Sequence, residues 1–148
     1  SVQGQVVNLL RELRDDLGLA YLFISHNLAV VRHLCAEVMV MYLGRVVACG
    51  PREAIYGSPL HPYTRMLLDA VPVADPAIER GRRRPSPARD LPSPLSPPSG
   101  CVFRTRCPLA IARCAESPPP REVAAPGHAV ACHRWREWPG GVAAPADR

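Results

Sequence analysis

Apolar and polar positions divide the chain into a patterned first half and a second half with little periodicity. Between residues 2 and 17 apolar side chains recur every three or four positions with charged side chains between them, which predicts an amphipathic helix ended by Gly18. Residues 19–24 form an unbroken apolar run rich in aromatic and branched side chains, the pattern of a strand buried on both faces of a parallel sheet. A helix that leads into a buried strand is half of a βαβ unit, so we expect an α/β fold.

The next part of the chain predicts four short elements. Asn27 is a favourable N-cap for a helix from residue 28 to about residue 35. A tight turn at Gly44-Arg45 separates two apolar, branched segments that read as strands. The two strands are expected at residues 37–43 and 46–49. Two prolines favour helix starts, so we expect helices that begin near Pro51 and Pro62.

The composition changes after residue 72. Residues 72–99 contain eight of the 18 prolines and few branched apolar side chains, which is typical of a linker or an extended strap. We therefore expect four regions: a domain part at 1–72, a proline-rich linker at 73–99, an irregular cysteine segment at 100–133, and a disordered Gly/Ala/Pro-rich tail at 134–148.

Charge and hydropathy exclude several classes of protein. No run approaches the roughly 20 apolar residues that span a bilayer, and the first residues lack a signal-peptide pattern, so we expect a cytosolic or peripheral protein. The net charge is +5, but the densest arginines, at 80 and 82–84, lie in the proline-rich stretch without interleaved aromatic residues. We therefore expect no nucleic-acid partner. All 18 basic residues are arginine, so no phosphate-binding loop ending in Gly-Lys-Ser/Thr exists in these residues.

One histidine lies at the end of a predicted strand, a position from which an imidazole can contact a phosphate group. The triplet Ser25-His26-Asn27 follows the predicted strand and precedes the next helix. An imidazole at the tip of a strand can donate to a phosphate oxygen held by another segment. An ordinary strand-end histidine beside a helix cap would show the same three residues, so the triplet alone leaves both interpretations open.

Six cysteines fall into two sets. Cys35 and Cys49 lie in a predicted helix and strand, where we expect buried small hydrophobic side chains. The other four are separated by five, six and seventeen residues and are called the cysteine cluster below: Cys101, Cys107, Cys114 and Cys132. Four thiolates suffice for a metal site, with His128 or His133 as a substitute ligand for zinc. Unmetallated thiols and, in an oxidising compartment, disulfides are the other interpretations.

Two longer strings carry a family resemblance. Residues 38–47 (VMVMYLGRVV) and 58–65 (SPLHPYTR), together with the Ser-His-Asn triplet, resemble the C-terminal part of the ATP-binding subunits of oligopeptide, dipeptide and nickel ABC importers. Residues 1–5 are similar to those that follow the family's D-loop, and residues 91–101 to its approach to a C-terminal cysteine module. The resemblance implies the C-terminal part of a P-loop-type ABC nucleotide-binding domain, followed by a proline-rich linker and a small irregular cysteine module.

The resemblance also implies roles for particular residues. His26 matches the switch histidine, which contacts the γ-phosphate of ATP, and Asn27 stands where the family usually has aspartate. The Walker A, Q-loop, signature, Walker B and D-loop motifs would precede Ser1, so this chain is expected to be a fragment. ATP and Mg²⁺ would then be cofactors of the intact subunit only, and ATP hydrolysis a property of its dimer. For the cysteine cluster the resemblance favours a four-iron four-sulfur cluster over zinc.

Partners and location follow from the same resemblance. It implies a second ATP-binding subunit, transmembrane permease subunits and, indirectly, an external substrate-binding protein, at the cytoplasmic face of the cell membrane. Dipeptides, oligopeptides and nickel all remain open as cargo. The alternative function is a small metal-binding or redox module, carried by the cysteine cluster and without nucleotide chemistry. For the segment that contains His61 we expect a proline-initiated helix packed through Tyr63, Leu67 and Leu68, with no metal role for His61.

Overall fold

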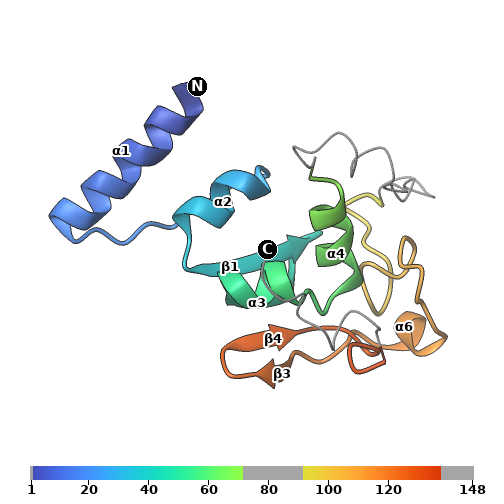
Figure 1. The fold of residues 1–148 in the computed structure, drawn as a ribbon. Coiled ribbons are helices and arrows are strands. Elements are labelled where there is room, and N and C mark those ends of the chain that lie inside the picture. The colour runs from blue at the N-terminus through green and yellow to red at the C-terminus, as the bar shows by residue number, and fades with distance from the viewer. Residues whose placement is uncertain (1, 72–91, 138–148) are drawn as a thin grey trace, which may run out of the picture. The chain divides into compact units, whose positions relative to one another are not determined.

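The computed structural model describes residues 2–71 and 92–137, and the side chains from residue 4 onward (Figure 1). The described residues are mixed α/β, with one four-stranded antiparallel sheet. The chain divides into two compact units, residues 1–36 and residues 37–148. Residues 73–91 of the predicted linker and residues 138–148 of the predicted tail lie outside the described residues.

The first unit contains two helices. Helix α1 (Val2–Leu17) ends at Gly18, whose φ of 64° lets the Leu19 N–H reach the Arg14 carbonyl at 3.1 Å. Helix α2 (Leu28–Leu34) confirms the predicted cap, because the Asn27 side chain accepts from two backbone N–H groups of its first turn. The guanidinium of Arg14 donates to the Leu34 carbonyl at 3.2 Å and joins the two helices.

The predicted buried strand at residues 19–24 is wrong for this structure. The run has no strand partner, and Leu22 and Ile24 are 92% and 89% exposed. A parallel strand exists only through hydrogen bonds to strands beside it, and every strand pair among the described residues is antiparallel and lies in the second unit. The apolar pattern is therefore present without the sheet that would bury it.

The second unit starts with the predicted β-hairpin, but its turn is at Leu43-Gly44, one residue before the predicted Gly44-Arg45. Strand β1 (Glu37–Tyr42) pairs with β2 (Arg45–Pro51), and buried and exposed residues alternate along β1. The turn uses left-handed backbone at Leu43 and Gly44, with φ values of 45° and 74°. Two successive left-handed residues match the twist of the strands they connect, which fixes the register of the pair.

Two short helices follow the hairpin. Helix α3 (Arg52–Gly57) begins after Pro51, and α4 (Pro62–Asp69) has its proline in the first turn, so both predicted starts are confirmed. The buried side chains of α4 are Pro62 and Thr64, with its N-cap His61 beside them, while the expected packing residues at 63, 67 and 68 are only half-buried. Cys35 and Cys49, expected in the core, are half-buried as well.

The C-terminal segment belongs to the same sheet. Helix α6 (Arg113–Glu116) precedes a second hairpin, β3 (Glu122–Ala125) and β4 (His128–Val130), and the strand order is β1-β2-β4-β3. Strand β4 pairs with β2 at Ala48 and Cys49, and the Ala131 N–H donates to the Val47 carbonyl at 2.9 Å. This short pairing ties residues near the end of the chain to the first hairpin.

The core of the second unit contains residues that come before and after residues 72–91 in the chain. Val47 and Ile55 come from before this range, and Phe103 and Val130 from after it, and none is more than 3% exposed. Residues 133–137 form a turn in which the Trp135 indole N–H donates to Glu122 on β3 at 3.2 Å. Within the part of the chain that the structure describes, no helix combines the length and the hydropathy needed to cross a bilayer.

Candidate functional site

His26 lies in the turn between the apolar run and α2. The Ser25 hydroxyl accepts the Asn27 N–H at 3.0 Å, and the Asn27 side-chain oxygen accepts the N–H groups of Ala29 and Val30 at 3.1 and 3.3 Å. These bonds fix the backbone on both sides of His26, while its own side chain stays exposed. An exposed imidazole on a fixed backbone can meet a ligand presented by another segment of a protein.

The four thiols of the cysteine cluster lie near one another in the second unit. Cys101 and Cys114 are each 8% exposed, and the Cys101 N–H donates to the Cys114 carbonyl at 2.8 Å. Burial, with a smaller contribution from the nearby thiols of Cys132, Cys101 and Cys114, raises the pKa of Cys107 to about 11. Burial is also the main reason why the pKa values of Cys101 and Cys132 are raised. These groups are therefore neutral thiols at pH 7.

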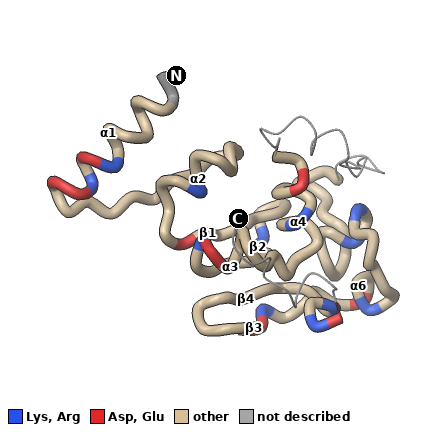
Figure 2. The backbone as a smooth tube through the Cα atoms, in the orientation of Figure 1, with Lys and Arg blue, Asp and Glu red and all other residues tan. Residues whose placement is uncertain are grey.

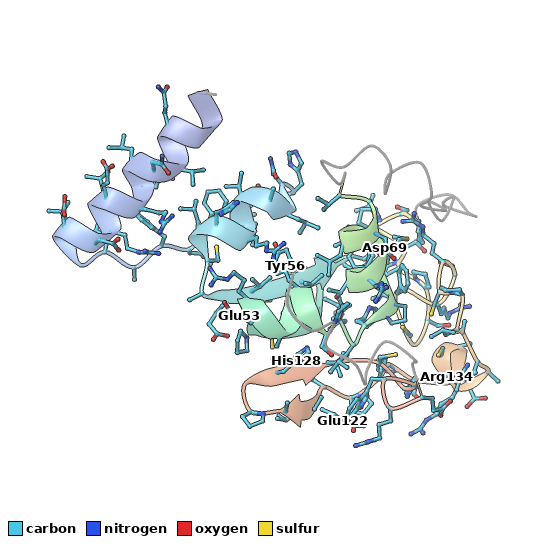
Figure 3. The ribbon with its side chains drawn as sticks, viewed as in Figure 1. Glu53, Tyr56, Asp69, Glu122, His128 and Arg134 are labelled. Atoms are coloured by element: carbon cyan, nitrogen blue, oxygen red, sulfur yellow. The ribbon has the colours of Figure 1, made fainter. Side chains whose placement is uncertain are left out.

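The arrangement of these thiols does not fit a ready-made metal site. Among residues 2–71 and 92–137, no three Cys, His, Asp or Glu side chains are placed so that they could hold a metal ion together. His133, one proposed substitute ligand, has its Nε2 at 3.0 Å from the Ser117 carbonyl. His128, the other, is 4% exposed on β4 (Figure 3) with a lowered pKa because of its burial. The metal assignment of the cysteine cluster stays a prediction.

An aromatic cluster that the sequence did not reveal lies between the first hairpin, α4 and the C-terminal segment. Its members are Tyr42, His61, Tyr63 and Phe103. The Phe103 ring centroid is 5.2, 5.7 and 5.3 Å from those of Tyr42, His61 and Tyr63 respectively. The four residues are brought together from three segments, so no periodic signal along the chain could have identified the cluster.

His61 is the buried polar member of the aromatic cluster. It is 1% exposed, and its Nδ1 accepts the Tyr63 N–H at 3.1 Å, which caps α4. Burial lowers the pKa of His61 to about 4. Because a protonated Nδ1 cannot accept a hydrogen bond, the cap and the burial both require a neutral ring. In this structure His61 therefore caps α4.

The arginines of residues 2–71 and 92–137 are spread along the chain. Figure 2 shows the arginines of the described residues distributed over several helices, strands and loops, with acidic residues interspersed. Several of them are paired: Arg65 with Asp69, Arg134 with Glu137, and Arg136 with Glu122. A nucleic-acid-binding surface usually shows a continuous basic stripe, so this distribution gives no support for such a partner.

Comparisons with known proteins point to transport proteins. The family model described as "Oligopeptide/dipeptide transporter, C-terminal region" matches residues 47–114. The oligopeptide transport ATP-binding protein OppF of Salmonella typhimurium is 51% identical over 132 residues, which are 89% of this chain and 39% of that protein. The OppF protein of Escherichia coli is 50% identical over 132 residues, with the same coverage of 89% and 39%. The chain thus spans about two-fifths of the length of the curated relatives it matches.

Proposed function

Since this chain belongs to the family of oligopeptide and dipeptide transporter ATP-binding proteins and matches their C-terminal part, we propose that it forms that part of the ATP-binding subunit of an ABC importer for peptides. One observation carries the proposal: about half of the residues are identical to those of OppF proteins along nine-tenths of the chain. In the intact subunit ATP and Mg²⁺ are the cofactors, and ATP hydrolysis supplies the energy for import.

The partners are those of such an importer. A second ATP-binding subunit closes against the first when ATP binds, and a pair of transmembrane permease subunits responds to this closure. An external binding protein delivers the substrate. The subunit is attached to the permease at the cytoplasmic face of the membrane, and peptides are the proposed cargo because the relatives carry oligopeptide transport in their names.

Exposed apolar residues in the first unit support its place in a larger domain. Leu22 and Ile24 are almost fully exposed, and Val6, Leu9 and Leu17 of α1 are at least half exposed. Large apolar side chains gathered in this way mark surfaces that other parts of a protein cover. We propose that residues 1–72 are part of the ATP-binding domain, whose other residues cover this surface, and that 73–99 form a linker, 100–133 a cysteine segment and 134–148 a tail.

His26 is the proposed contact to the γ-phosphate. Its backbone is fixed by Ser25 and Asn27 while its imidazole is exposed, which leaves a ring N–H available to a phosphate oxygen. Phosphoryl transfer depends mainly on positioning and on stabilising charge at the phosphate oxygens. The loop that binds the other phosphate groups needs a lysine, which this sequence lacks, so that loop belongs to other residues of the subunit.

The test compares two histidine variants in the full-length subunit that contains this chain. His26→Ala should lower the ATP turnover number by about a hundredfold or more while ATP binding changes less than tenfold, because general acid–base and charge-stabilising groups contribute on that scale. His33→Ala is the matched control, since His33 is an exposed histidine on α2. Turnover that is unchanged in His26→Ala, or equally lowered in His33→Ala, contradicts the role of His26.

A separate proposal concerns metal binding by the cysteine cluster. Four neighbouring thiols support a four-iron four-sulfur cluster, with zinc as the second choice, because soft thiolate ligands suit both. The placement of the thiols gives no ready ligand set, so no step of the transport reaction is assigned to a metal. A stand-alone metal-binding or redox module, the alternative function, has no support from the relatives, which are ATP-binding transport proteins.

A further inference from the structure

Phe103 lies between two cysteines of the cysteine cluster and is almost fully buried. It follows Cys101 by two residues and precedes Cys107 by four, and it is 1% exposed. Two turns bracket it, because the Arg104 N–H donates to the Cys101 carbonyl and the Arg106 N–H to the Phe103 carbonyl, each at 3.0 Å. The position of the Phe103 ring therefore determines the position of the loop that carries both cysteines.

The aromatic neighbours of the Phe103 ring, Tyr42, His61 and Tyr63, come from the first part of the second unit. Tyr42 is the last residue of β1, and His61 and Tyr63 form the cap and first turn of α4. Their ring centroids lie 5.2 to 5.7 Å from that of Phe103 in tilted or edge-to-face arrangements. Aromatic pairs in this geometry stabilise a contact beyond the area that they bury, so the loop is anchored to this part of the unit.

The other two cysteines of the cluster depend on the same anchored loop and on the sheet. Cys114 is joined to Cys101 by a backbone hydrogen bond of 2.8 Å. At Gly100 a Cβ atom would lie 2.4 Å from the Cys114 carbonyl oxygen, so α6 and the loop are in close contact. Cys132 follows directly after Ala131, whose N–H bonds to β2. Each cysteine of the cluster is thus connected to the first hairpin or to α4, either through its own loop or through a neighbouring residue.

We propose that the aromatic cluster positions the cysteine cluster, such that loss of the Phe103 packing opens the loop of residues 101–107 and exposes the four thiols together. The chemistry of these thiols, whether with a metal ion or an alkylating agent, is thereby coupled to the packing of β1 and α4. This inference concerns contacts within the second unit and does not rest on nucleotide chemistry.

Alkylation of the reduced chain by N-ethylmaleimide under native conditions tests the proposal, with the rate resolved for each cysteine by mass spectrometry. Phe103→Leu should speed the modification of Cys101 and Cys114 about tenfold, because the modification rate of a buried group follows the population of the open form. Cys35, in the first unit, should keep its rate. Ile111→Ala is the matched control, since Ile111 is an exposed apolar residue of the same segment. Rates for Cys101 and Cys114 that stay within threefold of the wild type overturn the proposal.

A second test uses the wild-type chain and therefore does not depend on whether Phe103→Leu folds. The Tyr63 amide is bonded to His61, and the Cys101 amide to Cys114. If the two clusters open together, hydrogen exchange should give these two amides protection factors within about threefold of each other. A Tyr63 amide that exchanges more than tenfold more readily than the Cys101 amide would mean that α4 can open without releasing the cysteines, and would overturn the proposal.

Discussion

Replacing His61 by asparagine should change how the stability of the second unit depends on pH. Asparagine keeps a side-chain oxygen that can accept the Tyr63 N–H at the start of α4, but it does not titrate and has no ring to pack against Phe103. In the wild type the pKa of His61 is lowered by burial from 6.5 to about 4. The unfolded chain therefore binds more protons than the folded one between these two values, so stability falls as the pH decreases through this window.

The magnitude follows from the size of the shift. One pKa unit corresponds to about 1.4 kcal/mol, so His61 costs the wild type about 3 kcal/mol of unfolding free energy when the pH falls from about 7 to about 4. At neutral pH the variant should be less stable by about 1 to 2 kcal/mol, because it loses an aromatic contact in the core. The two stability curves should therefore cross between about pH 6 and pH 4.5.

Urea unfolding followed by tryptophan fluorescence measures both curves, since Trp135 lies in the second unit with its indole N–H bonded to Glu122. His128 also has a pKa lowered by burial, but it is present in both proteins, so its contribution cancels in the difference. His33→Asn serves as a control because His33 is exposed, and its curve should run parallel to that of the wild type. A difference between wild type and His61→Asn that stays constant across this pH range refutes the reasoning.

Three further predictions concern glycines and the turn that holds His26. Gly44→Ala should destabilise the second unit by about 1 kcal/mol because Gly44 has a φ of 74°. Gly57→Ala should stabilise it by about 0.5 kcal/mol, because Gly57 ends α3 with open space where the Cβ atom would lie. Urea unfolding of both variants checks that the two changes have opposite signs. Gly100→Ala should destabilise by 2 kcal/mol or more, as its Cβ would overlap a carbonyl of α6; a value close to that of Gly44→Ala would show that the backbone yields. Ser25→Ala should speed hydrogen exchange of the Asn27 amide by up to about tenfold, and Ser25→Thr should restore it.

The parts of the fold that could be predicted from the sequence depend on local signals. Asn27 caps α2, Gly18 ends α1 and Gly44 turns the first hairpin, and each acts on residues within a few positions of itself. The same logic placed the start of α4 near Pro62. Such local effects do not depend on where the rest of the protein lies. Periodicity, caps and turns in the sequence are therefore enough to predict them.

The parts that could not be predicted depend on contacts between distant residues. The apolar run at residues 19–24 has the pattern of a buried strand, but whether a strand forms depends on neighbours that the pattern does not contain. Strand β4 has three residues, too few for a recognisable alternation. Phe103 lies with Val102 in a short stretch of cysteines, arginines and a threonine that shows no apolar periodicity, so its surroundings along the chain do not indicate that it is one of the most buried side chains.

His26 and the cysteine cluster differ in what the structure adds to them. The sequence pointed to His26 through its position after an apolar run, and the structure adds the hydrogen bonds of Ser25 and Asn27 that fix its backbone. For the cysteine cluster, the presence of four cysteines in a short loop-rich segment suggested a ligand set, although their spacing matches no common zinc finger. The structure instead gives raised pKa values for Cys101, Cys107 and Cys132, and no ready ligand set among the described residues. The number of cysteines in a segment is therefore weaker evidence for a metal site than the placement of their side chains.

The range matched by the transporter family model does not coincide with a folding unit. It runs from residue 47, inside β2, to residue 114, inside α6. The sheet that supports this range also needs β1 before it and β4 after it. Val130 on β4 is 0% exposed, and removing a side chain of this kind leaves a cavity that costs stability. Residues beyond the matched range thus contribute to the sheet and the core that support the matched residues, because β4 of the C-terminal segment pairs with β2 of the first hairpin.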